Sequence, residues 1–158
     1  MVEIEGYRQL EQTLGQLEKI PQKIVTKSAR KGANVIFKQA KKNAPVEIGN
    51  LKKGIILRPE KTRTKGKKVF QVVMDRSFNR FFVKISKSGK RAYYPASQEY
   101  GFFSRGPNGS RGRYIPGFNY LRGSNESKQG EAKQIIIRTM LTEVDKILWH
   151  LKKHYIMN

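Results

Sequence analysis

The C-terminal segment, residues 127–155, has the longest uninterrupted helical pattern in the chain and so limits the possible folds most. Apolar residues recur there at steps of three and four, the spacing of one helix face. At about 1.5 Å of rise per residue, this helix would be roughly 40 Å long. The rest of the chain must therefore pack along one side of a long rod. That side contains Ile136, Met140, Val144, Ile147, Leu151 and Tyr155.

Two further helices are predicted nearer the N-terminus. Residues 6–18 repeat leucine at helical spacing, and Ile20-Pro21 breaks this pattern. Pro21 suits the first turn of the next helix, where its missing N–H needs no partner. That second helix is predicted over 22–43 and ends before Pro45, because the residue before proline avoids the helical region. Its apolar stripe is small enough for another backbone to approach closely: Val25, Ala29, Gly32, Ile36 and Ala40.

The middle of the chain shows strand signals. Residues 53–59 and 67–75 are rich in Ile, Val and Leu, and the basic loop between them predicts a long hairpin. Residues 77–86 are a third strand candidate, followed by a turn at 87–90. Residues 93–100 fit a short helix or a strand equally well. Residues 103–125 are rich in glycine and arginine and are predicted to be a loop that a neighbouring subunit or ligand would order.

This order of elements predicts one α+β domain over 1–158. We expect an antiparallel sheet of three to five strands, with the two long helices packed on one of its faces. The turn after the second helix has a structural interpretation. Pro45 ends the helix, Gly49 permits positive φ, and Leu51 re-enters the core. A subunit contact beside this turn is the alternative.

The charge is unevenly distributed. The formal net charge is +21, yet residues 1–18 are acidic, with Glu3, Glu5, Glu11 and Glu18 against Arg8. The middle of the chain is strongly basic. Such a surface suits nucleic acid or an acidic protein neighbour, and charge alone does not choose between them. The residues expected to make this contact are Lys61, Arg63, Lys65, Lys67, Lys68, Arg105, Arg111 and Arg113.

The residue chemistry predicts neither an enzyme nor a cofactor or metal site. There is no cysteine, and His150 and His154 have no third ligand nearby. Glu99 is the only acid between Asp75 and Glu126, so it lacks the second carboxylate or base that catalysis requires. We expect it to form ion pairs. No membrane span or secretory signal is expected, which, with the absence of cysteine, predicts synthesis and assembly inside a cell.

Three segments carry a resemblance to a known family: KNAPVEIGNLKKGI at 42–55, YYPASQEYGF at 93–102 and IPGFNYLR at 115–122. In this order they resemble the phage tail-component or tail-completion (neck) family, similar to minor tail protein Z of lambdoid phages and to siphophage head–tail joining proteins. The resemblance implies a virion structural subunit at the head–tail junction. It implies a homo-oligomeric ring, with six copies favoured and twelve possible, that leaves a channel for DNA. The implied neighbours are a head-closure or connector protein and a tail terminator or tail tube protein.

Aromatic residues near these motifs are the expected anchors of a subunit or partner interface. Base stacking is the alternative use of such side chains, and a stand-alone basic nucleic-acid-binding protein is the alternative function. Trp149 joins the interface set because it lies off the main stripe of the C-terminal helix. The full set is Glu99, Phe102, Phe103, Tyr114, Phe118, Tyr120 and Trp149.

Overall fold

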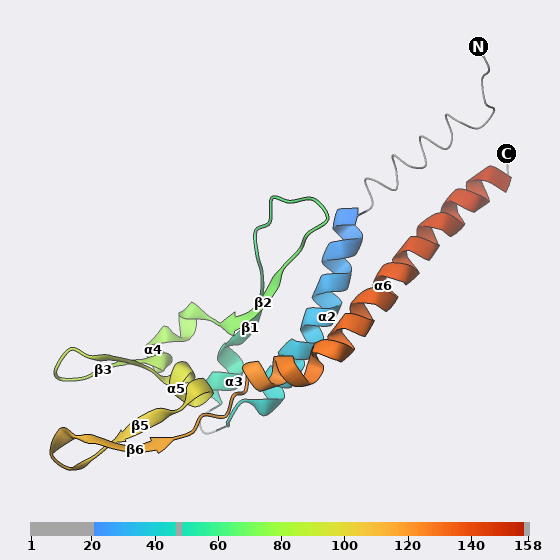
Figure 1. Ribbon diagram of the computed structural model, residues 1–158. Helices are drawn as coiled ribbons and strands as arrows, with labels where there is room; N and C mark the ends of the chain where they lie inside the picture. Colours follow the sequence, from blue (N-terminus) through green and yellow to red (C-terminus); the bar gives the residue numbers. More distant parts are fainter. Residues whose placement is uncertain (1–20, 47–48, 157–158) are drawn as a thin grey trace.

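The computed structural model describes residues 21–46 and 49–156, so the helix predicted over 6–18 lies outside the described residues. The molecule is elongated, with a pair of long helices at one end and two hairpins at the other (Figure 1). The elements run in the order α2 (Pro21–Asn43), α3 (Asn50–Gly54), β1 (Ile55–Pro59), β2 (Phe70–Met74), η1 (Arg76–Phe78), α4 (Asn79–Phe82), β3 (Val83–Ile85), β4 (Arg91–Tyr93), α5 (Tyr94–Tyr100), β5 (Phe102–Arg105), η2 (Pro107–Gly109), β6 (Arg111–Ile115) and α6 (Arg122–Ile156).

The two long helices, α2 and α6, pack side by side and antiparallel. Asn43, at the end of α2, donates a hydrogen bond to Ser124 near the start of α6, and Lys27 pairs with Glu143 further along at 2.9 Å. The hydrogen bond from Lys27 lowers the pKa of Glu143. Between these points the buried Gly32 faces α6 so closely that a Cβ there would lie 2.9 Å from the carbonyl oxygen of Ala132. The predicted close approach on the small stripe is confirmed.

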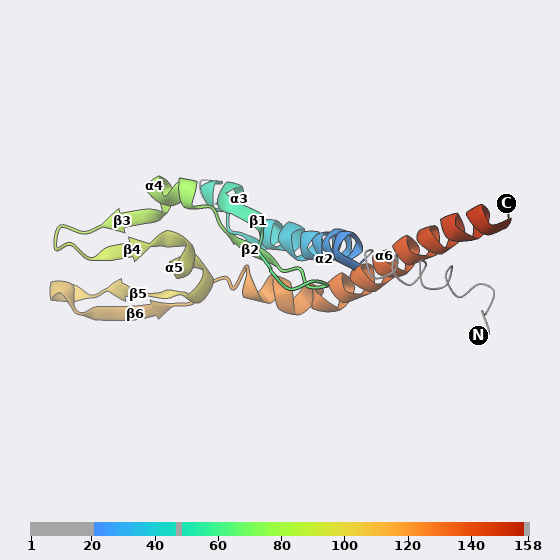
Figure 2. The ribbon, with the colours of Figure 1, turned by 90° about the horizontal axis from the view of Figure 1, so that it is seen from above.

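The helix α6 is 35 residues long and α2 is 23. Helix α6 begins at Arg122, five residues before its predicted start. At its other end α6 runs past the first residues of α2, and both views show its C-terminal part projecting from the body (Figure 2).

The first hairpin agrees with the prediction. Strands β1 and β2 pair antiparallel in a register that runs from Ile55 opposite Met74 to Pro59 opposite Phe70. Both strands contact α2. Residues 53 and 54, predicted as strand, belong instead to the short helix α3.

The strand predicted over 77–86 is mostly wrong. The carboxylate of Asp75 accepts a hydrogen bond from the backbone N–H of Ser77 at 2.9 Å, which starts the helical turns η1 and α4. This bond lowers the pKa of Asp75. Phe78 and Phe82 then lie one helical turn apart and stack with ring centroids 5.8 Å apart. Only Val83–Ile85 forms a strand, β3, which pairs with β4.

The loop predicted over 103–125 is also corrected. Strands β5 and β6 form a hairpin there, with the turn η2 at its tip. Asn108 and Gly109 both have positive φ, so the small and polar residues that suggested a loop form the tight turn of a hairpin. The preceding segment, which fitted helix or strand, is the helix α5, with Pro95 in its first turn.

The α+β class is confirmed, but the strands form three separate two-stranded sheets instead of one sheet. The helices also divide their contacts. Helix α2 packs on the first hairpin and on α6, so α6 reaches the body mainly through α2. The predicted arrangement, both helices on one face of a common sheet, is therefore wrong.

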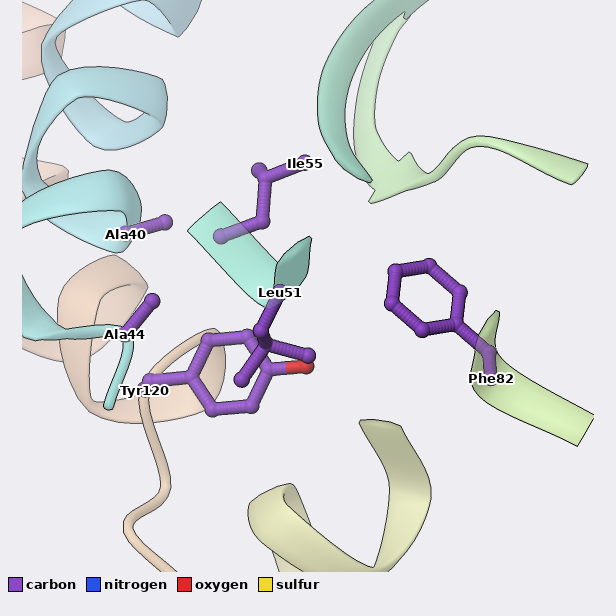
Figure 3. Close-up of a cluster of buried hydrophobic side chains, with 6 residues drawn as sticks. All are labelled: Ala40, Ala44, Leu51, Ile55, Phe82 and Tyr120. Atoms are coloured by element: carbon purple, nitrogen blue, oxygen red, sulfur yellow. The ribbon is translucent and has the colours of Figure 1, made fainter. Parts of the chain in front are cut away.

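The core lies where the helix pair meets the hairpins (Figure 3). Tyr120, fully buried, points into it from the segment before α6, and its hydroxyl donates to the Pro95 carbonyl at 3.4 Å. Burial raises the pKa of Tyr120. Leu51 is buried there and Gly49 has φ of 72°, so both predictions for the turn are confirmed. The cluster consists of Ala40, Ala44, Leu51, Ile55, Phe82 and Tyr120.

Candidate assembly surface

The end of the molecule opposite the helix pair, residues 83–115, is formed by β3–β4, α5 and β5–β6 and is called the hairpin end below (Figures 1 and 2). Glu99 is the only acid in this range. No carboxylate within residues 21–46 and 49–156 is placed to form a salt bridge with the basic side chains of this end. Those side chains are Lys84, Lys87, Lys90, Arg91, Arg105, Arg111 and Arg113.

Glu99 does not form the ion pairs predicted for it within the described chain. Its side chain is buried and accepts hydrogen bonds from the backbone N–H groups of Leu121 and Arg122 at 2.8 and 2.9 Å. These groups open α6, where free N–H groups attract a negative charge. Glu99 therefore caps α6 from a separate element. Close backbone contact supports this cap, because a Cβ at Gly117 would overlap the Glu99 carbonyl.

The seven predicted interface residues divide into three groups. Glu99 and Tyr120 are buried in the described chain, so their side chains lie outside any exposed surface. Trp149 is exposed but belongs to the C-terminal part of α6, away from the hairpin end. The remaining four are exposed at or beside the hairpin end: Phe102, Phe103, Tyr114 and Phe118.

A groove of about 600 Å³ lies where the turn before α3, the helices α4 and α5, the β3–β4 hairpin and β5 meet. Phe102 and Phe103 from β5 and Phe81 from α4 are among the side chains that line it. All three are more than 40% exposed, which is unusual for large apolar side chains that lie together. Sequence analysis missed Phe81 because the segment was interpreted as a strand. Asp75, a residue type preferred at helix N-caps, is the signal that would have placed it correctly.

Arginine side chains cover the β5–β6 hairpin. The guanidinium of Arg111 lies 3.4 Å from the ring centroid of Phe103, and that ring contacts Tyr114 at 5.1 Å. Arg105 lies directly opposite Arg111 in the register. Like charges in this position repel each other, so an anionic partner would stabilise the pair. The predicted aromatic and arginine residues are thus brought together on one hairpin.

The predicted basic loop, residues 60–67, extends over residues 60–69 in the structure, because β2 begins at Phe70. It lies apart from the hairpin end, beside the start of α2 (Figure 1). Its cations are mostly exposed. The side chain of Gln22 fixes the loop by two hydrogen bonds, accepting from the N–H of Gly66 at 3.0 Å and donating to the carbonyl of Lys67 at 3.2 Å. The charges of this loop are therefore held against α2. The predicted cations thus form two separate surfaces.

Replacing Gln22 with alanine should release this loop. Three exposed hydrogen bonds are lost, two to the loop and one to Thr26. Because all three are exposed, we expect the free energy of unfolding to fall by only about 1 kcal/mol. Hydrogen exchange at the Gly66 amide should become faster, since it loses its acceptor. Amide exchange measured by NMR checks this, with Lys23→Ala, an exposed neighbour on the same helix, as the control. Unchanged exchange at Gly66 would contradict the tether.

A comparison with family models gives one match, over residues 8–95, to the family described as "Bacteriophage HK97-gp10, putative tail-component". The match spans more than half of the chain. The chain belongs to this family. No curated protein and no solved structure gives a significant match. Membership makes the chain a phage tail component and hence a structural protein of the virion.

The region matched to the HK97 gp10 family runs from before α2 to the start of α5. It includes the helix–turn segment 42–55 and part of the groove, with Phe81. The hairpin β5–β6 and α6 lie beyond it. In the described part of this family member no helix could cross a bilayer, and no three metal-ligating side chains lie together.

Proposed function

We propose that this tail component is a subunit of a ring at the phage head–tail junction, where it joins the head connector to the tail around a channel for DNA. Six copies are favoured and twelve are possible. The observation that carries the proposal is the exposed aromatic groove at the hairpin end, at the opposite end of an elongated molecule from the projecting α6. A closed ring built head to tail needs two different contact patches on each subunit, and the shape offers them.

The charge distribution supports a neck position. The hairpin end and the basic loop 60–69 are two separate cationic surfaces. One would face an acidic neighbouring protein, and the other would line the channel. Contact with passing DNA in a channel should be weak and salt-sensitive, because the DNA has to slide.

Deletion of the gene tests the proposal in the phage itself. Full heads with unattached or defective tails are expected, and electron microscopy of the purified protein should show rings. Normal virions after deletion would refute the ring. A monomer that binds duplex DNA at submicromolar affinity in about 0.15 M salt would favour the alternative, a stand-alone nucleic-acid-binding protein.

A matched pair of substitutions tests the groove. Phe102→Ser removes a groove side chain that is 41% exposed, whereas Ile85→Ser removes a side chain outside the groove that is 72% exposed. An aromatic anchor contributes about 2 kcal/mol or more to an interface. When the deleted gene is replaced by the Phe102→Ser variant, the phage titre should therefore be at least about tenfold lower than with the wild-type gene. Ile85→Ser should complement fully. Equal titres for both variants would remove the groove from the assembly surface.

A further inference from the structure

The helix α6 has a second apolar stripe that the described chain leaves uncovered. Ile137, Leu141 and Leu148 are 41%, 59% and 47% exposed, and Val144 between them is half-buried. At 100° per residue these positions lie within about 30° of one line along the helix. The face that packs on α2, with Ala132 and Thr139, lies about 160° away around the helix.

The spacing of this outer stripe is that of a coiled-coil seam. The steps from Ile137 to Leu141, Val144 and Leu148 are four, three and four residues. In the sequence the same spacing continues to Leu151 and Tyr155. A seam of alternating three- and four-residue steps is suited to one partner helix with the same repeat.

Residues 1–18 contain a segment with this repeat. Tyr7, Leu10, Leu14 and Leu17 are separated by three, four and three residues. The segment is acidic, and the cations that flank the outer stripe at exposed positions are Lys133, Arg138 and Lys152, against one acid, Asp145. Segment and stripe therefore match in repeat and in charge.

The position of α2 favours a segment from another copy. Lys27 pairs with Glu143, so the start of α2 lies on the inner side of α6. From Leu17 to Pro21 the chain spans at most about 14 Å. Helices packed about 9 Å from α6 on faces about 160° apart have axes roughly 18 Å apart. Because each Cα lies about 2.3 Å from its helix axis, the segment could reach its own α6 only with residues 17–21 almost fully extended. A neighbouring copy has no such limit.

We propose that residues 7–17 of one copy dock as a helix on the outer stripe of α6 in the next copy. The inference rests on the proposed ring, for which it supplies one head-to-tail contact made of two different patches. It assigns a subunit role to the projecting part of α6, and to an N-terminal segment opposite in charge to the rest of the chain.

Cross-linking tests this directly, because the natural chain contains no cysteine. Thr13→Cys and Asp145→Cys place single thiols beside the two stripes and leave their apolar residues intact. The two full-length variants are mixed and treated with a flexible bis-maleimide. The expected product is a covalent dimer containing one chain of each kind. Adding Leu141→Glu and Leu148→Glu should lower its yield about tenfold or more, because two buried leucines are lost. Adding Ser127→Glu and Gln129→Glu, exposed positions before the stripe, should not.

Three outcomes would overturn the proposal. Dimers of Asp145→Cys alone would mean that α6 pairs with α6 of another copy. A cross-link only within a chain that carries both cysteines would mean that each segment covers its own helix. If native mass spectrometry detects rings but no cross-link forms, the proposed contact is wrong and the proposed ring still stands. Failure of the ring itself appears separately, as normal virions after gene deletion.

Discussion

Replacing Glu99 with alanine should lower the free energy of unfolding by about 4 kcal/mol, since two hydrogen bonds to a charged group contribute about 1.5–3 kcal/mol each. The carboxylate is only 3% exposed and accepts from the N–H groups of Leu121 and Arg122. Alanine would leave both donors without a partner, in a place that water reaches poorly. The start of α6 would lose the cap that holds it against α5.

The conservative variant separates this cap from simple packing. Glu99→Gln keeps the shape and one carbonyl acceptor but loses the charge, so we expect a smaller loss of about 2 kcal/mol. Denaturant unfolding followed by circular dichroism measures both. Hydrogen exchange should be fastest at Leu121 and Arg122 in the alanine variant. A loss below about 1 kcal/mol for Glu99→Ala would contradict the cap.

This cap also shows where sequence reasoning reached its limit. The isolation of Glu99 among basic residues was visible in the sequence and suggested ion pairs. Its actual partners are backbone N–H groups more than twenty positions later in the chain. Backbone donors carry no sequence signal, so only the fold could identify them. The same long-range contact starts α6 at Arg122, earlier than side-chain periodicity indicated.

Local patterns predicted the elements whose partners lie close in sequence or whose stripe is regular. Helix α2, the β1–β2 hairpin and the turn at Gly49 follow from such patterns. The strand predicted over 77–86 was wrong because the prediction relied on the apolar content of this segment. In the structure the Asp75 cap starts helical turns there instead. The prediction of a single sheet was also wrong, because pairing between hairpins depends on tertiary contacts that a local sequence pattern does not contain.

The assembly surface at the hairpin end was also predicted only in part. The aromatic and arginine residues of β5–β6 that were predicted as partner contacts are exposed, yet their hairpin was interpreted as a loop. Tyr120 was selected for the interface and is a core residue. Aromatic type alone does not distinguish a core anchor from a surface anchor, since both bury large apolar area in a pocket.

Replacing Gly32 with leucine should lower the free energy of unfolding by about 3 kcal/mol, because overpacking forces closely packed elements apart. Even a Cβ at this position would lie 2.5 Å from the Ile136 side chain and 2.9 Å from the backbone oxygen of Ala132. The side chain can move, but the backbone oxygen moves only with α6. The whole helix pair would have to separate. The expected loss exceeds the gain of about 1 kcal/mol that leucine brings to a helix in place of glycine.

The same substitution at Gly130 is the matched control. Gly130 lies within α6, and a Cβ there would meet nothing within 4 Å. Gly130→Leu should therefore raise the free energy of unfolding by about 0.5–1 kcal/mol, through helix propensity alone. Opposite signs for one substitution in two helices identify the close α2–α6 contact as the cause. If Gly32→Leu were as stable as Gly130→Leu, α2 and α6 would not pack at this distance at Gly32. The assignment of the α2-facing side of α6 would then be wrong.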